Sequence, residues 1–303
     1  MGCDRGINSS NRTQDTLGSS TRSICERIDL LGSQQMIRVI RQGFVSDSLL
    51  YPYADLRWKS KSTNGERRFV VEGRLCVERL LSSTLDVESL LVQEGKESEV
   101  QRWSDRDVPV YVLPKSEICQ LVGFDFHRGF LACAYRPPKM QIAALNWSEA
   151  LRPVALAALG VSENENLGSM FRTAAALGVQ DILLDKQSAD PFARRTVRVS
   201  MGNVFKLRIY FLDHPAHQLR WMTTELGVRT IVTTLATDST PISDLSYDDR
   251  PIVLVMGNEA RGVDLEVASN ASDQTHIPME LGTDSLNVGV ATGICLHSIV
   301  SRL

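Results

Sequence analysis

Long apolar runs are missing from this 303-residue sequence. A membrane-spanning helix needs about 18 or more consecutive apolar residues, and no segment reaches that length, so we expect no transmembrane helix. The polar residues after Met1 contain no apolar signal-peptide core. Gly6 stands where an N-myristoylation signal needs Ser or Thr, so we expect no lipid anchor. We therefore predict a cytoplasmic protein with no membrane partner.

Closely spaced cysteines and histidines are also missing. The six cysteines contain no C-x-x-C pair, and of the five histidines only His214 and His217 are near enough to share a helix face. A metal site needs closer ligands, and disulfides need an oxidising compartment. We expect reduced cysteines packed as small apolar side chains and no bound metal.

An excess of basic charge, which is typical of nucleic-acid-binding proteins, is absent as well, because the formal net charge is −3. Local clusters matter more than the sum, since phosphate contacts need only one basic face. Two basic stretches, residues 57–74 and 190–208, each fit either a solvated helix face or an RNA contact. They contain Arg57, Lys59, Lys61, Arg67, Arg68 and Arg74, and then Arg194, Arg195, Arg198, Lys206 and Arg208.

The length predicts two domains. Residues 1–50 are expected to form an extension that is disordered or partly helical, disordered to about residue 22 and helical over Ser23–Gln42. Strands alternating with helical segments predict a small α/β domain over residues 51–136. Its strands are expected at 69–71, 89–92, 108–113 and 129–134, with a helix at 73–81. A polar linker follows over residues 137–152.

Residues 153–303 repeat the alternation more strongly. Strands are predicted near 154–158, 182–184, 207–211, 230–234, 252–256 and 275–277, and helices near 167–177, 214–226, 262–268 and 286–300. Continuous apolar strands such as Ile252-Val253-Leu254-Val255 are typical of a parallel sheet buried on both faces. Ligands of such sheets bind beyond the carboxyl ends of the strands, so the residues after each strand are candidates for a site.

Two of these strand exits carry unusual polar residues. After the first predicted strand, Asn166 lies near a helix start, where capping is its alternative role. Arg172 follows in an otherwise apolar helix, which suggests a charged partner. The other exit reads Gly257-Asn258-Glu259-Ala260-Arg261-Gly262. It lacks the Lys-Ser/Thr of a phosphate-binding P-loop, and no dinucleotide-binding G-x-G-x-x-G follows any predicted strand.

A third exit leads from residue 278 into the last helix. Asp284 or Ser285 fits as the cap of that helix. Asn287 would then lie inside the first turn, where an amide is a poor helix former that can contact a ligand.

These three segments resemble the three motifs of the SpoU (TrmH) family of RNA ribose 2′-O-methyltransferases. The matching stretches are Asn166-Leu167-Gly168-Ser169-Met170-Phe171-Arg172-Thr173-Ala174, Leu254-Val255-Met256-Gly257-Asn258-Glu259-Ala260-Arg261-Gly262, and Ile277-Pro278-Met279 with Asp284-Ser285-Leu286-Asn287-Val288. The resemblance spans about 152–300. It extends to 55–136, where Phe69–Gly73 and Phe126–Phe130 are similar to the family's L30e-like substrate-binding domain. Two departures are Gly289, where many relatives have serine, and the shifted glycine of Glu280-Leu281-Gly282.

The resemblance implies an α/β fold with a C-terminal trefoil-knot methyltransferase domain and a smaller N-terminal L30e-like domain. It implies S-adenosylmethionine as cofactor, an RNA substrate and a homodimer formed through the knotted domain. Glycine at 257 would let a ligand approach the backbone. The cofactor-binding residues carried over are Gly257, Ile277, Met279, Leu286 and Asn287, and the catalytic residues are Arg172, Asn166, Glu259, Ser285 and Asn287.

The resemblance assigns activation of the ribose hydroxyl to Arg172. An arginine with a pKa above about 12 is a poor base, so we expect it to bind the adjacent phosphate and stabilise the developing alkoxide. The proton would then pass to phosphate or water. Glu259 and Asn287 would orient Arg172 or the ribose, and Ser285 would position groups or cap the helix. Arg172 and Asn166 would face the cofactor region of the other subunit.

Arg194, Arg195, Arg198, Arg67 and Arg68 are the expected RNA-binding residues. The extra N-terminal domain favours an rRNA substrate, with tRNA as the alternative. A catalytically inactive RNA-binding or assembly factor of the same fold is the alternative from another class.

Overall fold

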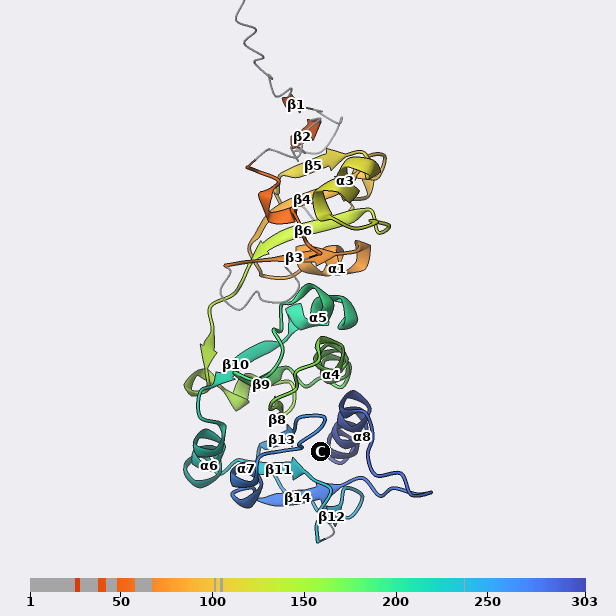
Figure 1. The fold of residues 1–303 in the computed structure, drawn as a ribbon. Coiled ribbons are helices and arrows are strands. Elements are labelled where there is room, and N and C mark those ends of the chain that lie inside the picture. Colours follow the sequence, from red (N-terminus) through yellow and green to blue (C-terminus); the bar gives the residue numbers. More distant parts are fainter. Residues whose placement is uncertain are drawn as a thin grey trace, which may run out of the picture.

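Two β-sheets follow each other along the chain and lie one beyond the other in space (Figure 1). The computed structural model describes residues 25–27, 38–41, 48–57, 67–100, 102–103, 106–236 and 238–303. The expected disordered leader, residues 1–22, lies outside these residues.

The first sheet has the strand order β1-β2-β5-β4-β6-β3. Its strands are β1 (Cys25–Arg27), β2 (Arg38–Arg41), β3 (Arg68–Glu72), β4 (Val87–Gln93), β5 (Val110–Leu113) and β6 (Phe130–Tyr135). Its helices are the 3₁₀ turn η1 (Tyr51–Tyr53), α1 (Arg74–Leu81), α2 (Glu97–Val100) and α3 (Lys115–Val122). The four strands and the helix predicted for residues 51–136 are confirmed, whereas α2 and α3 were not predicted.

The helix predicted over Ser23–Gln42 is wrong. The described part of that segment forms β1 and β2, which pair antiparallel, and β2 continues the sheet by pairing parallel to β5. Apolar residues at roughly helical spacing misled the prediction, because short apolar segments fit a strand as well as a helix. The β-branched Val39 and Ile40 favour the strand, and the open edge of β5 supplies its hydrogen-bonding partner.

The second sheet is parallel throughout, with the order β12-β14-β11-β13-β8-β9-β10-β7. Its strands are β7 (Met140–Gln141), β8 (Val154–Ala158), β9 (Asp181–Asp185), β10 (Arg208–Leu212), β11 (Arg229–Thr233), β12 (Thr240–Pro241), β13 (Ile252–Met256) and β14 (Asp273–His276). Its helices are α4 (Asn164–Ala176), α5 (Arg194–Val199), α6 (Pro215–Leu226), α7 (Leu265–Ser269) and α8 (Val288–Val300), with 3₁₀ turns at Ile142–Ala144, Trp147–Glu149 and Asn203–Lys206. All the predicted strands and helices of this half are present.

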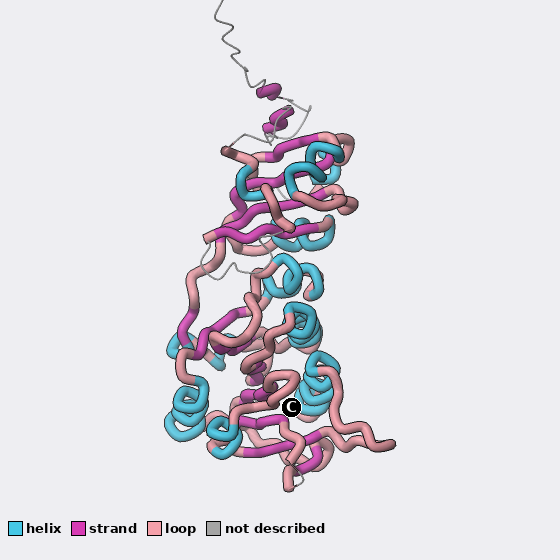
Figure 2. Tube along the Cα trace, in the orientation of Figure 1, coloured by secondary structure: helices cyan, strands magenta, loops and turns pink. Residues whose placement is uncertain are grey.

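The helices cover the second sheet on both faces. Helices α4, α5 and α8 lie on one face, and α6 and α7 on the other (Figure 1). Along one side of the molecule, α1, α5, α4 and α8 stand one beyond another (Figure 2). The segment predicted as a linker, residues 137–152, contributes β7 to the edge of this sheet beside β10.

Strand β13 occupies an unexpected place, between β8 and β11, although β11 precedes it in the chain. Val255 pairs with Ala157 of β8 on one side and with Val232 of β11 on the other. Strand β13 is thus inserted between two strands that precede it in the chain. This order differs from that of a sheet whose strands are added one after another along the chain. The trefoil knot implied by the resemblance stays a prediction.

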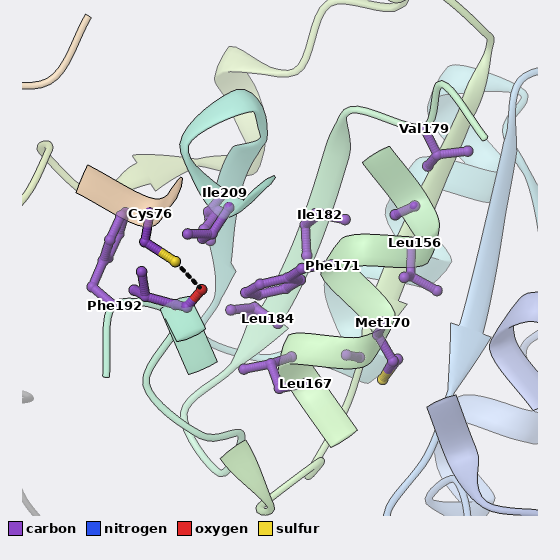
Figure 3. Close-up of a cluster of buried hydrophobic side chains, with 14 of the residues drawn as sticks. Cys76, Leu156, Leu167, Met170, Phe171, Val179, Ile182, Leu184, Phe192 and Ile209 are labelled. Atoms are coloured by element: carbon purple, nitrogen blue, oxygen red, sulfur yellow. Dashed lines mark hydrogen bonds between the residues drawn. The ribbon is translucent and has the colours of Figure 1, made fainter. Parts of the chain in front are cut away.

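The apolar core between the second sheet and α4 is continuous with that of the N-terminal domain. Leu167, Met170 and Phe171 of α4 are buried against Leu156 of β8 and Ile182 of β9 (Figure 3). The same cluster includes residues of the first domain, and the thiol of Cys76 on α1 contacts the carbonyl oxygen of Val197 on α5 at 3.9 Å (Figure 3). The α1 and α5 helices therefore pack directly, which joins the two domains.

Charged side chains complete this junction. The guanidinium of Arg79 on α1 donates to the carbonyl oxygen of Met201 at 2.6 Å. Arg194 on α5 lies 3.5 Å from the carboxylate of the buried Glu72 and donates to the carbonyl oxygen of Leu56 at 3.3 Å. Arg136, where the linker begins, pairs with Asp190 through two hydrogen bonds of 2.8 and 2.7 Å. The basic stretch 190–208 thus docks the N-terminal domain.

The described cysteines agree with their expected role as small apolar side chains. Among the described residues, Cys76, Cys119, Cys133 and Cys295 form no disulfide, and three of them are buried, Cys119 being the partly exposed one. Burial raises the pKa of Cys76 to about 11 and that of Cys295 to about 12, so both thiols are uncharged at neutral pH.

Helix α4 approaches α5 closely because it carries glycine at position 168. A Cβ atom there would lie 2.8 Å from both the Thr196 carbonyl oxygen and the Val199 Cβ. We predict that Gly168→Ala lowers the free energy of unfolding by about 1–3 kcal/mol through overpacking, measured by urea denaturation. Gly293→Ala on α8 is the control, because its new Cβ would meet only ordinary contact at 3.7 Å. Equal stability of the two variants would contradict this account.

Candidate active site

Three loops meet at the carboxyl edge of the second sheet. Residues 159–163 leave β8, residues 257–264 leave β13, and residues 277–287 connect β14 to α8. Because β8 and β13 are parallel neighbours, with Ala158 paired to Met256, their exit loops lie side by side. Asn258 secures that contact by donating from Nδ2 to the carbonyl oxygen of Gly160 at 2.7 Å.

A row of hydrogen bonds joins three of the predicted catalytic residues, one from each predicted motif. Asn287 Nδ2 donates to Asn166 Oδ1 at 2.8 Å, and Asn166 Nδ2 donates to Glu259 Oε1 at 2.8 Å. A carboxylate only accepts, so the Glu259 contact fixes the amide orientation of Asn166, which in turn presents its oxygen to Asn287. We call it the Asn–Glu–Asn row, after the order of Asn166, Glu259 and Asn287 in the sequence, although Asn166 lies in the middle of the hydrogen bonds. The row holds three distant chain segments in one arrangement.

The helix-start positions differ from the prediction. Asn287, and neither Asp284 nor Ser285, is the N-cap of α8, and its Oδ1 accepts from the backbone N–H of Gly289 at 2.9 Å. The amide can cap the helix with its oxygen and donate to Asn166 with its nitrogen at once. Helix α4 begins at Asn164, so Asn166 lies inside the first turn and does not cap it.

Two predicted catalytic residues lie apart from the row. Arg172 is exposed on α4, and within the described parts of the chain its side chain has no hydrogen bond or ion pair. Ser285 is exposed, and the contact of its hydroxyl is a 3.5 Å approach to Asp284. The guanidinium of Arg172, on the same helix as Asn166, is therefore available to bind a group of another molecule.

The loop after β13 is rigid for reasons internal to it. Asn258 and Gly262 form a two-way backbone bridge of 3.0 and 2.8 Å, and Asn258 Oδ1 accepts the N–H groups of Ala260 and Arg261 at 3.0 Å. At Gly257 a Cβ atom would lie 2.3 Å from the backbone carbon of Gly262. The expected reason for this glycine was room for a ligand, and the structure gives a nearer one, because a side chain would collide with the loop itself.

The predicted cofactor residues lie at the same edge, beyond β13 and β14. Ile277 and Met279 are half-buried, and Leu286 is 37% exposed. The loop after β11, residues 234–236, was not predicted from the sequence, and the strand order places it between the exits of β13 and β14. The backbone N–H of Thr234 donates to the Thr275 carbonyl oxygen at 2.8 Å, and Leu235 is 69% exposed. Only the strand order could reveal this loop.

These residues fit an adenosine and methionine ligand. Leu235, Leu286, Ile277 and Met279 offer partly exposed apolar side chains, which suit an adenine ring and a thioether chain. Backbone groups at the strand ends beside Gly257 are available for polar contacts. None of these four side chains is charged, so a neutral adenine bound against them would leave no charge unpaired.

The predicted RNA-binding arginines fall into three groups. Arg194 belongs to the domain junction, where burial lowers the pKa of its guanidinium against the opposing effect of Glu72, so it is unsuited to RNA contact. Arg68 is held by Glu88 through bonds of 2.5 and 2.7 Å, and Arg195 by Glu165 at 2.6 Å, although both are nearly half exposed. Arg67 is exposed and Arg198 half-buried.

The described ranges hold neither a membrane-spanning helix nor a cluster of metal ligands. No helix there is long and apolar enough to cross a membrane. No three or more His, Cys, Asp or Glu side chains of those residues gather in a way that could hold a metal ion.

Comparison with known proteins gives one family. The model of the SpoU rRNA Methylase family matches residues 153–297. An uncharacterized tRNA/rRNA methyltransferase of Mycobacterium bovis is 30% identical over 241 residues, covering 77% of this chain and 81% of that protein. The 23S rRNA (guanosine(2553)-2′-O)-methyltransferase RlmP of Bacillus subtilis is 26% identical over 246 residues, covering 80% of this chain and 94% of RlmP.

Solved structures agree in fold. The AdoMet-bound rRNA methyltransferase of Sinorhizobium meliloti superposes with a TM-score of 0.74 at 26% identity, covering 88% of this chain and 98% of that one. The AviRb methyltransferase of Streptomyces viridochromogenes, in complex with AdoMet, has the same fold at 18% identity, with a TM-score of 0.69 and coverage of 84% and 98%. The shared motifs, the parallel sheet and these relatives together show that the chain belongs to the SpoU family of AdoMet-dependent RNA methyltransferases.

Proposed function

We propose that this protein methylates a ribose 2′-hydroxyl of ribosomal RNA in the cytoplasm. The Asn–Glu–Asn row carries the proposal, because it places polar groups from all three predicted motifs beside the cofactor edge. The relative RlmP, which this chain matches over 94% of its length, is named as a 23S rRNA 2′-O-methyltransferase. The relatives named tRNA/rRNA methyltransferase leave tRNA as the alternative substrate.

The reaction needs alignment and the handling of one proton. AdoMet, when bound, supplies a methyl group already activated by the positive sulfur. The ribose oxygen forms a bond to the methyl carbon as the carbon–sulfur bond breaks, and the hydroxyl proton leaves to a phosphate oxygen or water. Most of the protein's contribution is therefore orientation.

Each residue of the site has a role that follows from its surroundings. Arg172 has no partner among the described residues, so it can bind the phosphate beside the target ribose and stabilise developing negative charge. One carboxylate oxygen of Glu259 accepts a hydrogen bond from Asn166, and the other oxygen can orient the ribose or Arg172. Asn287 fixes the start of α8, and thereby the neighbouring Leu286. Ser285 acts as a positioning hydroxyl.

The site is completed by a second copy of the chain. Helix α8 presents Val290 and Ile294 to solvent, 53% and 39% exposed, which is costly for a helix unless another surface covers it. We place a homodimer interface on this face. Helix α4 packs beside α8, so the interface would bring Arg172 of one subunit to the cofactor edge of the other.

Arg67, Arg195 and Arg198 are the RNA-contacting arginines of this proposal, with Arg68 at its margin. Arg195 and Arg198 lie on α5, in the same column of helices as Arg172 on α4 (Figure 1). The N-terminal domain, docked at α5, extends this face and supplies Arg67.

Arg172→Ala is expected to lower the rate of methyl transfer about 100- to 1000-fold, because the phosphate and alkoxide lose their cation. The affinity for AdoMet should stay within about twofold. Transfer is measured with labelled AdoMet and rRNA from cells that lack the gene, and AdoMet binding by calorimetry. Arg220→Ala, an exposed arginine on α6, is the control. Retention of full activity by Arg172→Ala would remove this residue from the mechanism.

Leu286→Arg is expected to weaken AdoMet binding by more than about tenfold, since it puts a charge against the adenosine-binding edge. Leu226→Arg is the matched control, because Leu226 is 47% exposed at the far end of α6. Calorimetry of both variants decides the placement of the pocket. An unchanged AdoMet affinity in Leu286→Arg would show that AdoMet binds elsewhere.

The shared site is tested by mixing two inactive variants, Arg172→Ala and Leu286→Arg. A heterodimer has one site with both residues intact only if Arg172 acts across the interface. Random exchange of subunits makes half of the dimers mixed, with one active site in two, so about a quarter of the wild-type activity should return. No recovery after verified subunit exchange would show that each site belongs to one subunit.

A further inference from the structure

The rigid loop that carries Glu259 separates the candidate active site from a cleft on its other side. It has a volume of about 930 Å³ and opens between the carboxyl ends of β8, β9, β10 and β13 and the first turns of α6 and α7. We call it the α6–α7 cleft. Its size suits a nucleotide. It is lined by Gly160 and Asn258, the residues whose hydrogen bond joins the loops of the active site.

The loop after β13 is a shared wall. Glu259 reaches Asn166 on one side, whereas Arg261, two residues later, lines the α6–α7 cleft on the other. The Asn258–Gly262 bridge fixes both positions relative to each other. A strand of RNA that crosses this wall would have one ribose at the Asn–Glu–Asn row and a neighbouring nucleotide in the cleft.

The cleft offers polar groups that the protein itself does not use. In the described parts of the chain, the side chains of Gln187, His217 and Arg261 line the cleft without a hydrogen bond or ion pair to another side chain. Leu265 at the rim is 86% exposed. Histidine and leucine suit stacking and apolar contact with a flat base, glutamine suits its hydrogen-bonding edge, and arginine suits phosphate.

The charges of the cleft indicate which part of a nucleotide enters it. Four carboxylates line the cleft, those of Asp185, Asp213, Asp264 and Glu266. Asp213 is paired with Lys186 at 2.9 Å, outside the lining. Acidic walls repel phosphate and accept hydrogen bonds from the amino groups of a base. The phosphate would therefore stay at the rim near Arg261. Among bases, uracil has no exocyclic amino group and fits worst.

We propose that the α6–α7 cleft binds the base of a nucleotide adjacent to the methylated one, preferring a base with an amino group, and so contributes to target choice. This inference rests on the proposed RNA-methylating function. It gives Gln187 and His217 a part in specificity and none in methyl transfer itself.

The experiment first maps the 2′-O-methyl site that wild-type protein makes in rRNA from cells lacking the gene. Transcripts of that region, with each neighbouring nucleotide replaced in turn, are then methylated by wild-type protein, by Gln187→Ala, by His217→Ala and by the double variant. Gln180→Ala at the amino end of β9 and Arg220→Ala, on α6 outside the cleft, are the controls.

Each cleft variant should lower kcat/KM for RNA about fivefold to tenfold, with AdoMet affinity unchanged within about twofold. One neighbouring position should matter to the wild-type protein, with uridine there lowering kcat/KM about tenfold. This preference should shrink in the double variant, because the base is no longer held against the carboxylates of the cleft.

Three results would overturn the inference. If the cleft variants behave like the controls, RNA does not use the cleft, and the proposed function stands. Weaker AdoMet binding in the cleft variants would assign the cleft to the cofactor. If wild-type protein methylates no ribose in any rRNA or tRNA, the proposed function fails and the inference with it.

Discussion

The pairing of β13 between β8 and β11 is the constraint on which the rest of the structure depends. In a parallel sheet, all carboxyl ends lie at one edge, so neighbouring strands bring their exit loops together. The Ala158–Met256 pair puts Gly160 beside Asn258, and the hydrogen bond between those two residues fixes the loops. Asn166 and Glu259 then meet, although 93 residues separate them in the chain.

Several of the arginines stabilise the fold of this protein, a role that the composition alone does not reveal. Arg194 and Arg79 dock the two domains, and Arg208 pairs with the buried Asp181 through bonds of 2.6 and 2.8 Å. A buried carboxylate without its cation would cost several kcal/mol, so these pairs are needed once the acids are buried. The arginines that we propose for RNA contact are those on the open face of α4 and α5, together with Arg67.

Most of the second sheet could be predicted from the sequence, because central strands such as β8 and β13 are continuous apolar runs followed by polar, glycine-rich exits. The prediction of Ser23–Gln42 as a helix failed, because a strand at the sheet edge depends on the distant β5. Strand order is equally long-range, and for that reason the loop with Leu235 was missed. The motifs gave Asn166, Glu259 and Asn287, which the structure joins. The cap at Asn287 was missed, since three polar residues in succession could all have capped α8.

In the proposed function, the loop from Gly257 to Gly262 serves both the Asn–Glu–Asn row and the α6–α7 cleft, and its rigidity couples the two. Its bridge and the acceptor oxygen of Asn258 engage the backbone N–H groups of Asn258, Ala260, Arg261 and Gly262, so its conformation is set without a ligand. Within this turn Glu259 contacts Asn166 on one side, and Arg261 lines the α6–α7 cleft on the other. A catalytic group on a wall of this kind cannot shift without shifting what lies behind it. Recognition of a nucleotide on one side can therefore position the neighbouring ribose on the other with no further moving part, because the backbone between them is already fixed.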